Sequence, residues 1–288
     1  MFRCCKAFSL TELLTVIAII AVLTAVLLPV LGKARDAARQ VMGAMNQRQV
    51  IVGAQEYATD GNDRYPESVA TVGLRSTFWN WQEPGMMTGL RKRTPTTHRS
   101  MSAYLYPYLE SSGTMYCSNA PDVYPFLDEV WEAGESWDHP ETGPVQDPFS
   151  GTLCFYWNYV GYLPATDGTF QGPQRIDGRR NESTLMVTEY FGYDHWRSPG
   201  AFGSCKKFDD AAITAGSPVS SSYWSIVDPD KNLDEIDIDL QAGYTDGHVE
   251  SYQAADTFEM KVSLTADGMS PYPPGAGPGI FFLPRDAK

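Results

Sequence analysis

The sequence predicts an α+β fold in which one long N-terminal helix packs on a mainly antiparallel β-rich head. Three observations predict it. Residues 13–31 form an apolar run with no formal charge, and helical spacing of apolar residues continues to about Thr59. From Tyr65 onward the pattern changes to short apolar and aromatic runs separated by turn-forming pairs, which is typical of strands.

Composition excludes several classes of protein. The 288 residues are 43% hydrophobic and 20% charged, which excludes a disordered or collagen-like chain. The formal net charge of −13 comes from 22 Lys plus Arg against 35 Asp plus Glu. Because an acidic surface repels phosphate groups, we expect no nucleic-acid partner.

The apolar run at residues 13–31 is long enough to cross a membrane, since a spanning helix needs about 20 apolar residues. It is longer than the apolar region of about 7–15 residues in a secretory signal peptide, and no small-residue cleavage site follows it. The run therefore predicts a single transmembrane segment. Two cationic side chains precede it and three follow it closely, so charge counting leaves its orientation open.

Beyond the apolar run the helix is predicted to become amphipathic. Apolar and small residues recur every three or four positions, and Arg48 interrupts this stripe. The stripe consists of Ala34, Ala37, Val41, Ala44, Met45, Ile51 and Val52. We expect one helix of about 75 Å from about Ser9 to about Thr59. Pro29 removes a backbone donor, which predicts a bend or a loosened turn between residues 25 and 32.

Glu12 is a carboxylate at the head of the apolar run. An unpaired charge inside a bilayer costs roughly 2.5–3.5 kcal/mol at the centre and less near the interface, so such a residue normally has a partner. If the chain were cut between Ala7 and Phe8, the new α-amine would stand four residues before Glu12. The other interpretation is that Glu12 extends to the lipid headgroups.

Residues 6–31 resemble the signal of type IV pilins and type II secretion pseudopilins. The resemblance implies that prepilin peptidase cuts between Ala7 and Phe8 and methylates the new amine. It implies that Glu12, fifth in the mature chain, guides assembly, and Pro29 matches a proline common in the family. The sequence departs from the pattern at Ala7, where the family usually has glycine.

This resemblance implies the organisation and the function of the chain. Residues 1–7 would be a leader, 8–63 the long helix and 64–288 the head with a Pro/Gly-rich tail. The expected function is that of a non-enzymatic structural subunit of a filament, with other pilin-like subunits, the peptidase and an inner-membrane assembly platform as partners. It would be a single-pass inner-membrane protein before assembly, and then part of a periplasmic or extracellular filament.

A second resemblance lies near the C-terminal end. Residues 244–250 are similar to the Asp-Gly-His-Val ending of pilin-like proteins from planctomycete-type bacteria. That group usually has a histidine ten residues before the aspartate, where this chain has Ile236.

The head is expected to contain several short strands. The candidates are Met101–Leu105, Thr152–Val160, Ser183–Tyr190, Ser222–Val227 and Gly243–Gln253. Asp246-Gly247 within the last run predicts a hairpin, because both residue types tolerate positive φ. The tail from Pro271 to Pro284 is expected to form an ordered strap across the head.

Cysteines and acidic residues suggest two further features. Cys4 and Cys5 fall in the leader, and export would leave Cys117, Cys154 and Cys205 as candidates for one disulfide, with no preferred pair. Oxygen ligands alternate as in the start of a calcium loop at Asp228, Asp230, Asn232 and Asp234. The turn lacks the usual glycine, so a solvated acidic turn is the other interpretation, and no further cofactor is expected.

Two alternatives from other classes remain open. The head could be an adhesin or a glycan-binding module that uses Trp79, Trp81 or Trp157. It could also be a membrane-tethered enzyme, which would need a pocket that gathers His248 or His195 with carboxylates. We expect no enzymatic activity, since no catalytic motif accompanies these histidines.

Overall fold

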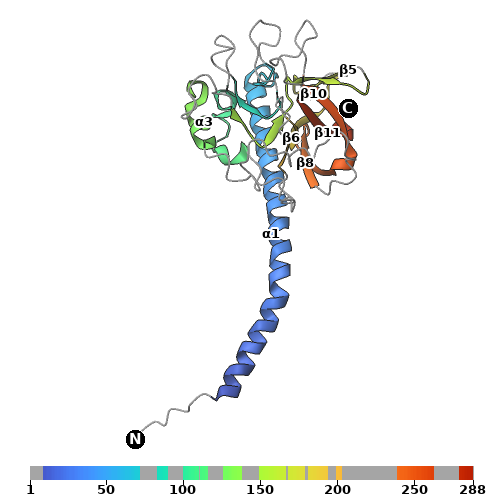
Figure 1. Ribbon diagram of the computed structural model, residues 1–288. Helices are drawn as coiled ribbons and strands as arrows, with labels where there is room; N and C mark the ends of the chain where they lie inside the picture. Colours follow the sequence, from blue (N-terminus) through green and yellow to red (C-terminus); the bar gives the residue numbers. More distant parts are fainter. Residues whose placement is uncertain are drawn as a thin grey trace.

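The computed structural model describes residues 9–71, 83–89, 100–109, 111–115, 126–137, 149–166, 168–178, 181–193, 199–202, 239–262 and 279–287. Helix α1, Leu10–Asp60, begins far from the head and ends inside it (Figure 1). The other described elements gather around its C-terminal half (Figure 1). The fold is therefore the expected α+β arrangement of a long helix on an antiparallel sheet.

Both ends of α1 are set by the residues next to them. Ser9 is the N-cap, and its hydroxyl accepts a hydrogen bond from the Glu12 amide. At the other end the Gly61 amide donates to the carbonyls of Tyr57 and Ala58. The helix is unbroken at Pro29 and curves gradually over its N-terminal half (Figure 1). The predicted local bend is thus spread over several turns.

Nine of the described strands form one antiparallel sheet, in which β6, Leu185–Tyr193, is the central member. The order is β5-β4-β10-β11-β6-β8-β9, and β3 and β7 also pair with β6. The other bounds are β3 Leu153–Phe155, β4 Val160–Leu163, β5 Gly168–Gln171, β7 Pro199–Phe202, β8 Asp239–Tyr244, β9 Val249–Gln253, β10 Thr257–Val262 and β11 Ile280–Pro284. Two 3-10 turns, η7 Ala254–Asp256 and η8 Arg285–Ala287, flank β10 and β11.

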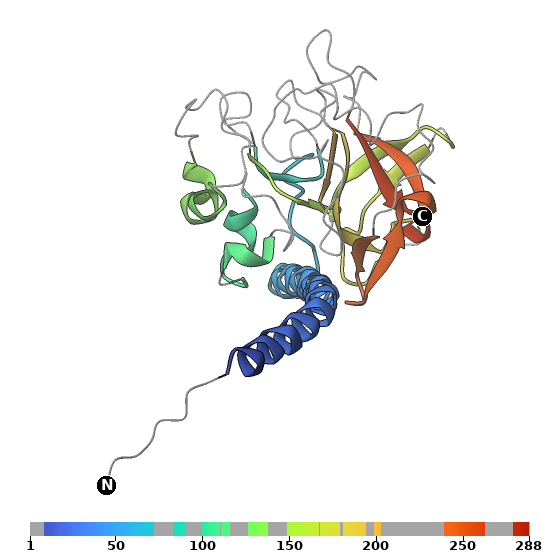
Figure 2. The ribbon, with the colours of Figure 1, turned by 60° about the horizontal axis from the view of Figure 1, so that its bottom comes forward.

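A smaller group of elements lies beside α1, away from the large sheet (Figure 2). It consists of α2 Met101–Leu105, α3 Leu127–Ala133, the 3-10 turns η1 Ser112–Met115 and η2 Gly134–Ser136, and the strand pair β1 Met86–Thr88 with β2 Phe149–Ser150. Helix α1 contacts η1 and α2 of this group as well as β8, β6 and β9 of the sheet. It therefore runs between the two groups (Figure 2).

Two strand predictions were wrong. Met101–Leu105 is helix α2, because the Ser100 hydroxyl caps it by accepting from the Ala103 amide, and a five-residue apolar run has no diagnostic period. Thr152–Val160 is interrupted between β3 and β4. Asn158 adopts a positive φ of 52° there, and its side-chain amide donates to the carbonyls of Tyr65 and Pro66.

The other strand predictions fared better. The run Ser183–Tyr190 lies largely within β6, and Gly243–Gln253 is the predicted hairpin formed by β8 and β9. The end of the tail is not a strap, because β11 is a paired strand between β10 and β6. Ser222–Val227 and the beginning of the tail lie outside the described residues.

The helix face that enters the core differs from the predicted stripe. Ile51 is buried as expected, but Val41, Met45 and Val52 are exposed. The residues buried against the head are Gly43, Gln47, Val50, Ile51, Gly53, Ala54 and Ala58. The two faces differ because the buried one includes Gln47, a polar residue that lies outside the apolar stripe and that the head buries completely.

Candidate functional site: the free helix end and the hairpin that holds the helix

The N-terminal part of α1 projects from the head with its side chains exposed on every side (Figure 1). Residues 9–38 are all exposed, and the most apolar stretch of the helix has none of its residues buried. The hydroxyls of Thr15 and Thr24 donate to the carbonyls of Glu12 and Ile20, so they add no unsatisfied donor to this surface. Such a segment needs an apolar environment, because water disfavours it.

This helix is long and apolar enough to cross a membrane. Length and composition alone would also fit a signal sequence near the N-terminus. Length and composition therefore do not identify the role of this helix, and the residues at its tip give further information.

The tip of α1 is closed by Ser9 and Glu12, which cap the helix reciprocally. The Glu12 amide donates to Ser9 Oγ at 3.2 Å, and Glu12 Oε2 accepts from the Ser9 amide at 2.9 Å and from Ser9 Oγ at 2.8 Å. This is a capping box, and the Ser-x-x-Glu spacing could have predicted it. Ala7 and Phe8, the predicted processing residues, lie outside the described part of the chain.

The capping box has a consequence for the chemistry of Glu12. Both hydrogen bonds go to Oε2, so within the described residues Oε1 is open to a further donor. The carboxylate is held in place by its own helix, and it can still accept a hydrogen bond from a cation on another chain.

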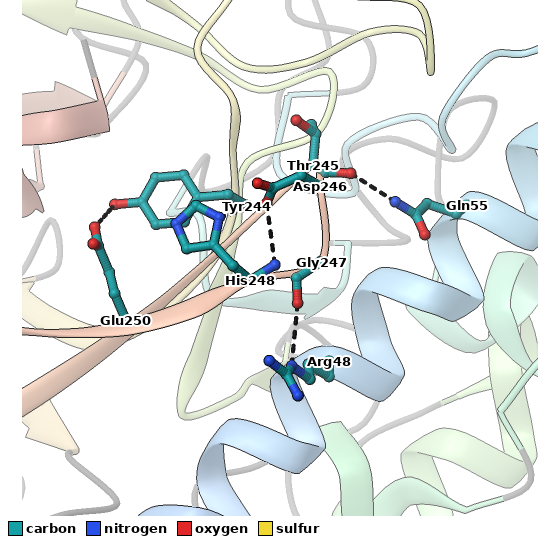
Figure 3. A network of polar contacts seen from close by, with 8 residues as sticks. All are labelled: Arg48, Gln55, Tyr244, Thr245, Asp246, Gly247, His248 and Glu250. Atoms are coloured by element: carbon teal, nitrogen blue, oxygen red, sulfur yellow. Dashed lines mark hydrogen bonds and ion pairs between the residues drawn. The ribbon is translucent and has the colours of Figure 1, made fainter.

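At the other end of the helix, the turn between β8 and β9 is built from aromatic and charged side chains (Figure 3). The rings of Tyr244 and His248 stack with centroids 4.5 Å apart and an interplanar angle of 8°. Asp246 Oδ1 accepts from the His248 amide at 3.1 Å and lies 2.5 Å from His248 Nδ1. Gly247 has a φ of 85°, which confirms the predicted reason for a glycine there.

These contacts shift two pKa values in the turn. The His248 amide and ring both hydrogen-bond to the Asp246 carboxylate and hold its pKa below the ordinary value. Burial raises the pKa of Tyr244, and so does the 2.5 Å hydrogen bond that its hydroxyl donates to Glu250. The turn is thus stabilised as a local unit.

The same turn is bonded to α1 (Figure 3). Arg48 Nε donates to the Gly247 carbonyl at 3.2 Å, and Gln55 Nε2 donates to the Thr245 carbonyl at 2.7 Å. Two further hydrogen bonds continue this connection along β8, from Gln47 Nε2 to the Gln241 carbonyl at 3.3 Å and from Gln241 Nε2 to the Gln40 carbonyl at 3.0 Å. We call these four hydrogen bonds the helix–hairpin junction.

A glycine lets α1 approach the sheet closely at this junction. A Cβ placed on Gly243 of β8 would lie 2.6 Å from Ile51 Cδ1 and 3.1 Å from Val187 Cγ1. Both distances are shorter than ordinary van der Waals contact, so a Cβ here would require the Ile51 and Val187 side chains to move. The sequence did not predict the junction, and Arg48 was notable there only as an interruption of the apolar stripe.

Most residues of the predicted disulfide and of the predicted calcium loop lie outside the described part of the chain. Cys154 on β3 is a free thiol in the described part of the chain, it is completely buried, and burial raises its pKa. Cys117 and Cys205 lie outside the described residues, so their pairing stays a prediction. All four residues of the candidate calcium loop also lie outside them (Asp228, Asp230, Asn232 and Asp234).

The two alternative functions lose some of their candidate residues. Trp157 has no exposed surface, so it cannot stack on a glycan, while Trp79 and Trp81 lie outside the described residues. His248 supports the turn, and His195 is not described. No group of three or more His, Cys, Asp or Glu side chains that could hold a metal ion occurs in the described ranges.

Comparison with known proteins identifies the N-terminal segment. A family model of the prokaryotic N-terminal methylation motif matches residues 2–28. This range includes Ala7, Phe8 and Glu12, so the N-terminal segment of the chain carries a prepilin-type methylation signal. No curated protein and no solved structure matches the chain. The similarity to the Asp-Gly-His-Val group stays a prediction.

Proposed function

We propose that this protein is a structural subunit of a type IV pilus-like or type II secretion filament, cut between Ala7 and Phe8 by prepilin peptidase. The observation that supports the proposal is the free apolar helix end with Glu12 at its tip, inside a matched methylation motif. A plain membrane anchor would need the apolar surface and would use the Glu12 carboxylate only to cap its own helix, which engages Oε2 and leaves Oε1 open to a further donor.

The physical problem of assembly is that lipid tails are as apolar as leucine. Moving the residue 13–31 segment from lipid into a bundle of identical helices therefore gains little from the hydrophobic effect, and packing and polar contacts must favour it. The Phe8 amine of one subunit and Glu12 of another would supply such a contact. Their attraction is strong because the surroundings have a low dielectric constant.

The helix–hairpin junction would determine where the heads lie in such a filament. Hydrogen bonds from Arg48 and Gln55 to the turn fix the head to the C-terminal half of α1. A filament built on the N-terminal half would then carry the heads at defined positions outside its core. Before assembly the subunit would sit in the inner membrane with its leader in the cytoplasm, until the assembly platform draws it into the periplasmic or extracellular filament.

The test separates the charge of Glu12 from its capping role. Glu12→Gln removes the charge and keeps a side chain that completes a capping box, whereas Glu12→Ala removes both. We expect both variants to enter the membrane and neither to appear in the sheared filament fraction. Thr15→Val, one turn further along the same helix, is the matched control and should assemble normally, since its hydroxyl bonds only within the helix. Normal filament yield from Glu12→Gln would overturn the proposed role of the charge.

A further inference from the structure

Two cations follow the apolar part of α1 directly. Lys33 and Arg35 are exposed, and within the described residues neither has a hydrogen bond or an ion pair. The next cation along the helix, Arg39, differs from them, because it is half-buried and lies 3.9 Å from the carboxylate of Asp36. Lys33 and Arg35 are therefore the cations next to the residue 13–31 segment that can bind a partner outside the chain.

Their distance from the apolar segment matches the headgroup layer of a membrane. The residue 13–31 segment is about 29 Å long, close to the thickness of about 30 Å of the hydrocarbon core of a bilayer. With this segment in the core, the backbone at Lys33 and Arg35 lies about 3 and 6 Å beyond its edge, inside the headgroup layer. Residues two apart on a helix point to nearly opposite sides, so the two cations face lipids on both sides of α1.

We propose that Lys33 and Arg35 bind the phosphate groups of anionic phospholipids in the leaflet next to the head. The inference rests on the membrane-bound stage of the proposed function and is independent of filament assembly. The ammonium group of Lys33 and the guanidinium group of Arg35 donate hydrogen bonds to phosphate oxygens, which are strengthened by the opposite charges. The long side chains reach the phosphates from backbone positions near the hydrocarbon edge.

The charge of the rest of the chain sets these two cations apart. Beyond residue 39 the sequence has 17 Lys plus Arg against 33 Asp plus Glu, so an anionic membrane repels the head. Gly43, the first residue of α1 that the head buries, lies about 18 Å beyond Leu31. This distance exceeds the screening length of about 8–10 Å at 0.1–0.15 M salt. The repulsion of the head is therefore screened, whereas Lys33 and Arg35 act within the headgroup layer.

The test uses the purified full-length chain in phosphatidylcholine vesicles that contain a trace of spin-labelled phosphatidylglycerol or of spin-labelled phosphatidylcholine. Electron paramagnetic resonance gives the fraction of each labelled lipid that the protein immobilises, and hence the relative association constant of the two lipids. We expect phosphatidylglycerol to be favoured by a factor of about 2–5, since one cation near an anionic headgroup gains up to about fivefold. High salt should reduce this factor, because exposed charges are screened.

Three double variants separate the charges at this site from charge elsewhere. Lys33→Gln with Arg35→Gln removes both cations and should abolish the preference for phosphatidylglycerol. Lys33→Arg with Arg35→Lys keeps both charges and should keep the preference. The matched control is Arg64→Gln with Lys261→Gln, which removes two cations of the head. Arg64 follows the far end of α1 and Lys261 lies on β10, so this control should leave the preference unchanged.

Each outcome has one interpretation. A preference that is lost with Lys33→Gln and Arg35→Gln, and is kept in the other two double variants, supports the lipid site. Equal association of the two labelled lipids with the unsubstituted chain overturns it, and so does a preference that survives the loss of both cations or is lost in the control. These results leave the filament proposal intact, since assembly is not measured. A chain that does not insert into the vesicles overturns the membrane-bound stage of the proposed function, and the lipid site fails with it.

Discussion

Gln55 in helix α1 donates a 2.7 Å hydrogen bond to the carbonyl of Thr245, 190 residues later in the sequence. The bond joins the helix to the turn between β8 and β9, next to the bond from Arg48 to Gly247. Three of the four hydrogen bonds of the helix–hairpin junction thus run from side chains of the helix to backbone carbonyls of the hairpin.

Gln55→Ala should destabilise the attachment of the hairpin by about 1 kcal/mol, because the half-buried carbonyl of Thr245 loses its donor. The measurement is thermal unfolding of the full chain in detergent, followed by the fluorescence of the buried Trp131 and Trp157. Gln49→Ala is the matched control, since Gln49 is exposed on the same helix and should leave the midpoint unchanged. Equal midpoints for the two variants would contradict the role of the junction.

Gly243→Ala should be more damaging, with a loss of about 1–3 kcal/mol from overpacking against Ile51 and Val187. The same unfolding measurement applies. Gly32→Ala is the control, because a Cβ there meets no atom within 4 Å and alanine favours the helix. The account would be wrong if Gly243→Ala unfolded at the temperature of the unsubstituted chain.

Asp246 should make the hairpin sensitive to acid. Hydrogen bonds from His248 lower the pKa of Asp246 in the folded chain, so the carboxylate stabilises the fold above the ordinary aspartate value of 3.8. That contribution is lost as the pH falls through the lowered pKa. Between about pH 6 and about pH 2, Asp246→Asn should therefore lose less stability than the unsubstituted chain. Parallel loss in both chains would argue against the shift.

Cys154 should resist alkylation in the folded protein, because its thiol is completely buried and burial raises its pKa. Peptide mapping after treatment with iodoacetamide should find the Cys154 peptide unmodified in the native protein and modified after unfolding. Rapid labelling of the native protein, or a disulfide at Cys154, would contradict the packing of β3 against β6.

The helix and the hairpin could be predicted from the sequence because their signals are local. Ser9 and Glu12 are three residues apart, the apolar run is continuous, and Asp246-Gly247 is a turn signal of two residues. The strand prediction at Met101–Leu105 failed because five residues do not distinguish a helix from a strand unless the cap at Ser100 is taken into account.

The helix–hairpin junction could not be predicted, because its partners are distant in the sequence. Nothing near Gln47 shows that it will be buried and will donate to the Gln241 carbonyl. A polar side chain on a helix is expected to be exposed to solvent unless the partner that it bonds to in the core is known. The predicted apolar stripe therefore differs from the face that the head buries, since Val41, Met45 and Val52 belong to the stripe and are exposed.

The most direct test of the filament proposal is mass spectrometry of the N-terminal peptide of this chain, isolated from sheared filaments of the cells that make it. The account predicts a chain that begins at Phe8 and carries a methyl group on its α-amine. A chain that still begins at Met1, or a filament fraction from which this protein is missing, would contradict it.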